Sequence, residues 1–254
     1  MKHQHYIDQT TGAQFSWDFL HLIDSGRLEE DDLHWSYIKT VKEYFPDSRT
    51  LLDMGTGGGE FLSSLTPLPE TVFATVSCES NLEIAKKRLS PLGVNLVCIP
   101  ESPEPPYNDN LPFESSFFNL IINRHEAYCP GEIKRILRGG GYFITQQMGA
   151  LSLCNLILDL PGEQAAFPHR NLMSAVTELE EAGFKIHKKR EQLVSVRFYD
   201  VDAVVCCLKN TPWLISGFSP DKYKRELGFI GSVIDSRGFY QSINHYFLII
   251  AQNF

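Results

Sequence analysis

The chain has 254 residues, of which 43% are hydrophobic and 12% aromatic, so it has enough apolar side chains for one sizeable buried core. Its formal net charge of −8 disfavours nucleic acid as the main partner, and its six cysteines lack zinc-ligand spacing, so we expect no metal site. No apolar run of about 18 residues predicts a membrane span, and Met1–His5 lacks the apolar core of a secretion signal, so we expect a cytoplasmic protein.

From Thr50 onward, short apolar runs alternate with amphipathic segments, which is typical of a parallel sheet covered by helices. A triple glycine, Gly139–Gly141, is expected to stop one of these helices. The expected strands are Leu51–Met54, Val72–Ser77, Val94–Ile99, Phe118–Asn123, Tyr142–Gln146, Leu193–Phe198 and Tyr246–Ala251. The expected helices begin near Gly58 and otherwise cover Asn81–Ser90, Gly131–Leu137 and Asn171–Glu181.

Two segments lie outside this alternation. Residues 1–48 are expected to form a helical cover, in which Asp32–Tyr44 is a helix with one apolar face. That face presents Trp35, Ile38, Val41 and Phe45. Residues 49–254 would form the main domain, with an insertion at about 200–244 that is long for a plain connector. Both segments either help to cover a substrate pocket or are ordinary packing helices.

The segment Leu51–Glu60 carries the strongest functional signal. An apolar run leads into Asp53, and Gly55, Gly57 and Gly59 follow at alternate positions. Glycines allow a strand to turn sharply into a helix and leave the backbone open to a ligand. The spacing matches neither a phosphate-binding P-loop nor the dinucleotide fingerprint. A carboxylate here would pair with an ammonium group and repel phosphates.

This arrangement resembles the first motif of the class I S-adenosylmethionine-dependent methyltransferases, in particular the small bacterial ones of unassigned substrate. The resemblance covers roughly residues 50–200. It implies an α/β fold, a three-layer α/β/α sandwich whose seven-stranded sheet is mostly parallel with an antiparallel last strand. It also implies that the glycine turn holds the amino-acid end of S-adenosyl-L-methionine. The residues concerned are Asp53, Gly55, Thr56, Gly57 and Gly59.

The resemblance implies further cofactor contacts after the next two strands. Glu79 stands 20 residues after Gly59, where an acidic residue accepts hydrogen bonds from the ribose hydroxyls, and Ser80 follows it. For the adenine, Glu101, Ser102 and Asp109 remain competing candidates, of which we select Glu101.

The segment Glu114–Tyr128 resembles the fourth methyltransferase motif, with Asn119 in place of the usual aspartate. The residues after this strand should lie at the edge of the sheet where open α/β folds bind ligands. We therefore expect Asn123 and Arg124 to bind the cofactor, and we take His125 and Glu126 as catalytic candidates. The alternative for His125 is that it orients the cofactor or packs against the loop.

Gln146 and Gln147 end the next strand and either bind a polar substrate or satisfy nearby backbone groups. The sequence thus predicts methyl transfer from S-adenosyl-L-methionine to a small molecule, by in-line displacement. Two alternatives stay open, an RNA base methyltransferase and a module that binds the cofactor without catalysis. The oligomeric state and the acceptor are not predicted.

Overall fold

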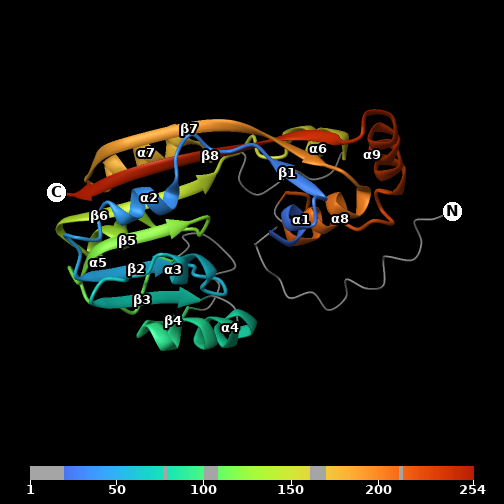
Figure 1. Cartoon of the computed structure of the whole chain (residues 1–254). Coiled ribbons are helices and arrows are strands. Elements are labelled where there is room, and N and C mark those ends of the chain that lie inside the picture. Colours follow the sequence, from blue (N-terminus) through green and yellow to red (C-terminus); the bar gives the residue numbers. More distant parts are fainter. Residues whose placement is uncertain (1–19, 77–78, 100–107, 161–169, 212–213) are drawn as a thin grey trace. The chain divides into compact units, whose positions relative to one another are not determined.

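The computed structural model describes residues 20–76, 79–99, 108–160, 170–211 and 214–254 (Figure 1). The chain divides into two compact units, each built from separated stretches. The sheet unit contains Leu33–Gly149, Arg170–Gln192 and Tyr246–Phe254. The helical unit contains Met1–Asp32, Ala150–His169 and Leu193–His245.

The sheet unit is organised around parallel strands. The pairs β2–β3, β2–β5, β3–β4 and β5–β6 are parallel, and only β8 runs antiparallel to β6. The strand order is β7-β8-β6-β5-β2-β3-β4. The strands are β2 (Thr50–Met54), β3 (Thr71–Val76), β4 (Asn95–Cys98), β5 (Phe118–Arg124), β6 (Leu137–Met148), β7 (Phe184–Phe198) and β8 (Tyr240–Asn253). The expected mostly parallel sheet with an antiparallel last strand is confirmed.

Helices cover both faces of this sheet because successive residues of a buried strand point to opposite sides. Leu51 packs in a core with residues of α2, α3 and α4, whereas Leu52 packs with residues of α5 and α7. The expected three layers are therefore present. The helices are α2 (Tyr37–Lys42), α3 (Glu60–Ser64), α4 (Glu79–Leu89), α5 (Pro130–Ile136) and α7 (Leu172–Glu181), with a short turn of 3-10 helix at Ser90–Leu92.

The helical unit has a hydrophobic core of its own. Its elements are α1 (Leu20–Asp24), β1 (Leu28–Glu30), α6 (Cys154–Asp159), α8 (Val201–Asn210) and α9 (Lys224–Arg237), together with the parts of β7 and β8 that belong to it. Leu28 of β1 lies opposite Phe198 of β7 in an antiparallel pair, and both side chains are buried in this core. Asp200 caps α8 by accepting a hydrogen bond of 2.7 Å from the Ala203 N–H.

Three expectations about the elements are wrong. The sheet has eight strands, because β1 lies within the segment 1–48 that was expected to be helical. A three-residue strand whose partner is distant in the chain leaves no local periodicity to read. The helix expected at Asp32–Tyr44 covers only Tyr37–Lys42, and Ile38 on its apolar face is 40% exposed.

The triple glycine is the third correction. Helix α5 already ends at Ile136, and Gly139–Gly141 lie inside β6. A Cβ atom at Gly141 would lie 2.9 Å from the Asn119 carbonyl oxygen, so the glycine permits close approach of β5 and β6 where their register shifts. None of the helices among the residues listed above as described is long and apolar enough to cross a lipid bilayer.

Candidate active site

The carboxyl ends of β2, β5 and β6 bring predicted site residues to one edge of the sheet. Met54 at the end of β2 lies opposite Asn123 of β5, and Asn123 lies opposite Thr145 of β6. Since the three strands are parallel, the residues that follow them gather at the same edge. The structure therefore brings Asp53, the glycine turn and the segment from Asn123 to Glu126 together.

Asp53 is a buried carboxylate with unused hydrogen-bonding capacity. It is only 3% exposed, and neither its Oδ2 nor the Oγ1 of Thr56 has a hydrogen-bond partner among the described residues. Burial raises the pKa of Asp53 to about 7, although the nearby Thr56 side chain and the positive charge of Arg124 both act to lower it. A buried acceptor of this kind is suited to a ligand that supplies N–H donors and positive charge.

The glycine turn is fixed to the neighbouring strand β3. Thr75 accepts hydrogen bonds of 2.9 Å from the Gly55 N–H, through its side-chain oxygen, and from the Thr56 N–H, through its carbonyl oxygen. Gly57 has φ +58°, and a Cβ atom there would meet no other atom within 4 Å. The turn is therefore held firmly at its start and is open at Gly57. No pattern in the sequence predicts this role of Thr75.

Helix α4 closes the turn from the other side. A Cβ atom at Gly59, which has φ +83°, would lie 2.7 Å from the Leu89 side chain. The Arg88 guanidinium donates to the carbonyl oxygen of Gly58 and pairs with the Glu60 carboxylate. Because α4 begins at Glu79, the chain places Glu79 and Ser80 directly after β3. Glu101 and Ser102 lie outside the described residues, and Asp109 is exposed.

Asn123 is fully buried, and its side chain is used within the protein. Its Oδ1 accepts hydrogen bonds from Gln147 Nε2 at 2.6 Å and from the Thr145 hydroxyl at 3.3 Å. Gln147 Nε2 also donates to the Glu126 carbonyl oxygen at 3.0 Å. Gln147 therefore positions the segment that follows β5. Its neighbour Gln146 accepts a hydrogen bond of 2.9 Å from the Trp35 indole.

His125 adopts a left-handed backbone conformation, with φ +68°, and its N–H donates to the Gln146 carbonyl oxygen at 2.9 Å. Its Nδ1 is buried and has no hydrogen-bond partner among the described residues. Burial, followed by the positive charges of Arg124 and Arg170, lowers the pKa of His125 to about 3. The imidazole is therefore neutral at physiological pH and is a weak base there.

Glu126 lies against the glycine turn. A Cβ atom at Gly55 would lie 2.8 Å from Cβ and Cγ of Glu126, so only glycine leaves room for this side chain. Asn108 Nδ2 donates to Glu126 Oε1 at 3.3 Å and to the Ala127 carbonyl oxygen at 2.7 Å. The carboxylate of Glu126 is thus held over the turn that contains Asp53. The preceding Arg124 is exposed, with its guanidinium 4.8 Å from the centre of the Phe61 ring.

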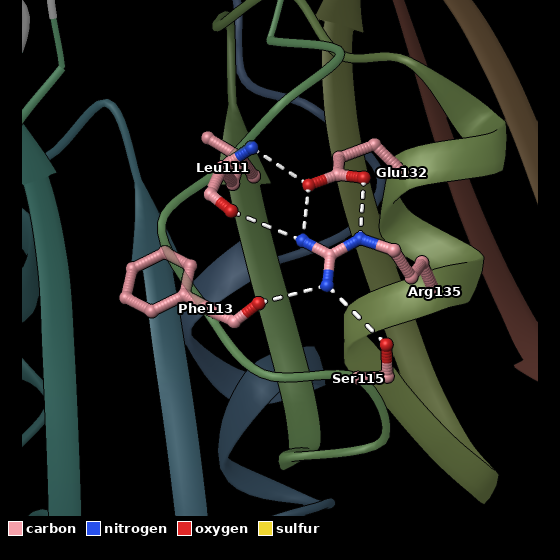
Figure 2. Close-up of polar contacts among 5 residues, drawn as sticks. All are labelled: Leu111, Phe113, Ser115, Glu132 and Arg135. Atoms are coloured by element: carbon pink, nitrogen blue, oxygen red, sulfur yellow. Dashed lines mark hydrogen bonds and ion pairs between the residues drawn. The ribbon is translucent and has the colours of Figure 1, made fainter.

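The segment before β5 is clamped to α5 (Figure 2). Glu132 is 6% exposed and forms a two-point ion pair with Arg135, at 2.6 and 2.8 Å. Glu132 also accepts a hydrogen bond of 2.7 Å from the Leu111 N–H. Arg135 donates to the carbonyl oxygens of Leu111 and Phe113 at 3.0 and 2.8 Å, and to the Ser115 hydroxyl at 3.4 Å. The clamp fixes the chain just after residues 100–107.

Comparisons with known proteins identify the fold. No protein-family model and no curated protein matches the sequence. A candidate methyltransferase from Bacillus halodurans has a TM-score of 0.61 and 18% identity, covering 86% of this chain and 99% of its own. Geranyl diphosphate methyltransferase, solved in complex with S-adenosylmethionine, has a TM-score of 0.51 and 15% identity, covering 85% and 84%. The cyclase SpnF has a TM-score of 0.53 and 13% identity, covering 87% and 84%.

Proposed function

We propose that this chain, which has the fold of the class I S-adenosylmethionine-dependent methyltransferases, transfers a methyl group from S-adenosyl-L-methionine to a small molecule. One observation carries the proposal. In the turn Asp53–Gly59, a buried carboxylate oxygen and the Thr56 hydroxyl lack hydrogen-bond partners among the described residues, next to an open glycine. Buried polar groups are otherwise satisfied in proteins, so this turn fits a ligand with N–H donors.

The residues present fit the amino-acid end of the cofactor. Asp53 and Thr56 would accept hydrogen bonds from its ammonium group, and Gly57 leaves space for it. Glu126, held over Gly55, adds a second carboxylate beside the turn. We assign Glu79 and Ser80 to the ribose and Glu101 to the adenine on their positions in the chain, and Asn123 and Arg124 to the same site.

The role we assign to the chain's own residues is to position the cofactor and the acceptor. Removal of a proton by the protein is not required for this reaction. When bound, S-adenosyl-L-methionine supplies a methyl group on an electrophilic sulfonium. In-line displacement gains most of its acceleration from alignment of the reacting atoms. Because the pKa of His125 is about 3, its neutral ring suits an orienting role better than that of a general base near pH 7. Glu126 remains the catalytic candidate, because its side chain lies next to the turn.

A small-molecule acceptor agrees with the net charge of −8, which opposes binding of a polyanion such as RNA. Geranyl diphosphate methyltransferase carries a small molecule in its name and has the same fold. The cyclase SpnF has this fold under a name that is not that of a methyltransferase. That likeness keeps cofactor binding without methyl transfer as the second candidate.

Two measurements test the proposal. S-adenosylhomocysteine at about 100 times its dissociation constant should stabilise the fold by roughly 2.7 kcal/mol, a rise in Tm of about 5–10 °C. Asp53→Asn should reduce this rise. Methyl-labelled cofactor with a metabolite extract and with RNA then separates the candidates. Label in the small-molecule fraction supports the proposal. Label in RNA would show that the acceptor is RNA and not a small molecule, and cofactor binding without any transfer favours the second candidate.

A further inference from the structure

Two adjacent cysteines on α8 have different surroundings. Cys207 is only 3% exposed and belongs to the core of the helical unit, where burial raises the pKa of its thiol to about 12. Cys206 is half-buried and packs at the margin of the same core. Structural thiols buried in a core are inert, whereas partly exposed thiols with polar and charged neighbours react. Of the two, Cys206 has the environment of a reactive cysteine.

Two polar side chains contact the Cys206 sulfur. Its Sγ lies 3.6 Å from Nε2 of His21 on α1, and 3.6 Å from Nδ2 of Asn210, one turn further along α8. Asn210 Nδ2 also donates to the Cys206 carbonyl oxygen at 2.9 Å, which fixes the side of the amide that faces the sulfur. Because an amide nitrogen only donates, the sulfur accepts from Asn210 and its own proton can pass to His21.

The Cys206 thiol is protonated at neutral pH. Burial raises its pKa above the usual value, and the Asp200 carboxylate adds to this rise. The positive charges of Arg27 and Lys209 and the hydrogen bond from Asn210 act to lower it. Since the thiolate is the nucleophile, the thiol needs a base in order to react near pH 7, and the imidazole in contact with the sulfur can supply one.

We propose that Cys206 is a modification site at which the thiol, with His21 as its base, exchanges with a small disulfide. His21 Nε2 takes the thiol proton while the Cys206 sulfur attacks one sulfur atom of the disulfide. The new S–S bond forms to Cys206, the original S–S bond breaks, and the leaving sulfur takes the proton from His21. Cys206 is oxidised and the leaving sulfur is reduced, so the disulfide is itself the oxidant.

Glutathione disulfide is the probe, used with the full chain near pH 7. Peptide mass spectrometry over time should show the glutathione adduct forming first at Cys206, more slowly at Cys98, and not at Cys207. Cys98 is the internal control because it is exposed. Dithiothreitol should remove the adduct, as expected for a disulfide. Slower modification of Cys206 than of Cys98 would overturn the proposal.

His21→Ala and His21→Asn test the role of the base. Each should slow adduct formation at Cys206 roughly 10-fold or more, because neither side chain can take up the thiol proton. The rate at Cys98 in the same molecule should not change. The smaller side chains leave the Cys206 sulfur at least as accessible, so a slower reaction reflects the loss of the base. An unchanged or faster reaction at Cys206 in both variants would refute this role of His21 and with it the site.

The outcome is independent of the proposed function. The rise in Tm with S-adenosylhomocysteine should persist in both His21 variants, because His21 lies in the helical unit and the glycine turn lies in the sheet unit. Slower exchange with an intact cofactor response therefore concerns Cys206 alone. A protein without any cofactor response that still exchanges first at Cys206 would contradict the proposed function and support the modification site.

Discussion

Asp53→Asn should make the ligand-free protein more stable and its cofactor binding weaker. The substitution keeps the size of the side chain and removes a charge that the fold buries almost completely. In the free protein that charge lowers the free energy of unfolding, because burial disfavours the ionised form. With a cationic ligand present, the same charge becomes a partner. The same residue thus lowers the stability of the ligand-free protein and raises its affinity for the ligand.

The magnitude follows from the pKa. The value rises from 3.8 to about 7 on folding, and each pH unit corresponds to about 1.4 kcal/mol, which gives about 4 kcal/mol. The folded state keeps a proton that the unfolded state releases between these two values. The free energy of unfolding therefore falls as pH rises through this window, and the full penalty is present above about pH 7. Asp53→Asn should gain roughly 2–4 kcal/mol at pH 8 and little at pH 4, allowing for the unsatisfied amide.

Urea denaturation from pH 4 to pH 8 measures this difference, and calorimetry with S-adenosylhomocysteine measures the loss of affinity. Asp235→Asn is the control, since Asp235 is exposed on α9 and its replacement should leave both quantities unchanged. Parallel pH profiles for the wild type and Asp53→Asn would refute the reasoning. So would a variant that is less stable at pH 8.

Three further predictions concern the same unit. Gly55→Ala should lose cofactor binding and destabilise the fold by about 1–3 kcal/mol, because of its φ of +68° and its contact with Glu126; denaturation of Gly55→Ala with and without Glu126→Ala should show partial rescue. Arg135→Ala should cost about 2–3 kcal/mol in urea denaturation by leaving the buried Glu132 unpaired, whereas Arg135→Lys should retain part of this energy. For His125→Asn we expect unchanged cofactor affinity and a slower rate of methyl transfer, since asparagine tolerates the left-handed backbone. The rate of the wild-type enzyme should show no titration near pH 6.5. Such a titration would restore the general-base role of His125.

The central strands and the glycine turn were predictable because their signals are local. A strand buried on both faces is a nearly continuous apolar run, as in Leu120–Ile122 of β5, and a turn that needs positive φ favours glycine. The signal for the start of α7 is also local, since the Asn171 side chain accepts a hydrogen bond of 2.9 Å from the Ser174 N–H. Asp53 stood out for the same reason, at the junction of these two patterns.

The remaining features depend on residues that are distant in the chain. The role of Thr75 arises only when β3 lies beside the turn, 20 positions away. The low pKa of His125 comes first from burial, which its neighbours in sequence do not reveal; the adjacent Arg124 and the distant Arg170 lower it further. The short β1 is fixed by β7, with Leu28 opposite Phe198. Such roles follow from tertiary packing, which overrides local preference.

The hydroxyl of Tyr37 accepts a hydrogen bond of 3.0 Å from the Asn123 N–H and lies 2.9 and 3.0 Å from the carbonyl oxygens of Asn123 and Ile144. These partners are 86 and 107 positions further along the chain. A residue synthesised before β2 therefore completes the junction of β5 and β6, directly before His125. The edge of the sheet that we propose to bind the ligand is therefore complete only when α2, which carries Tyr37, has docked against β5 and β6.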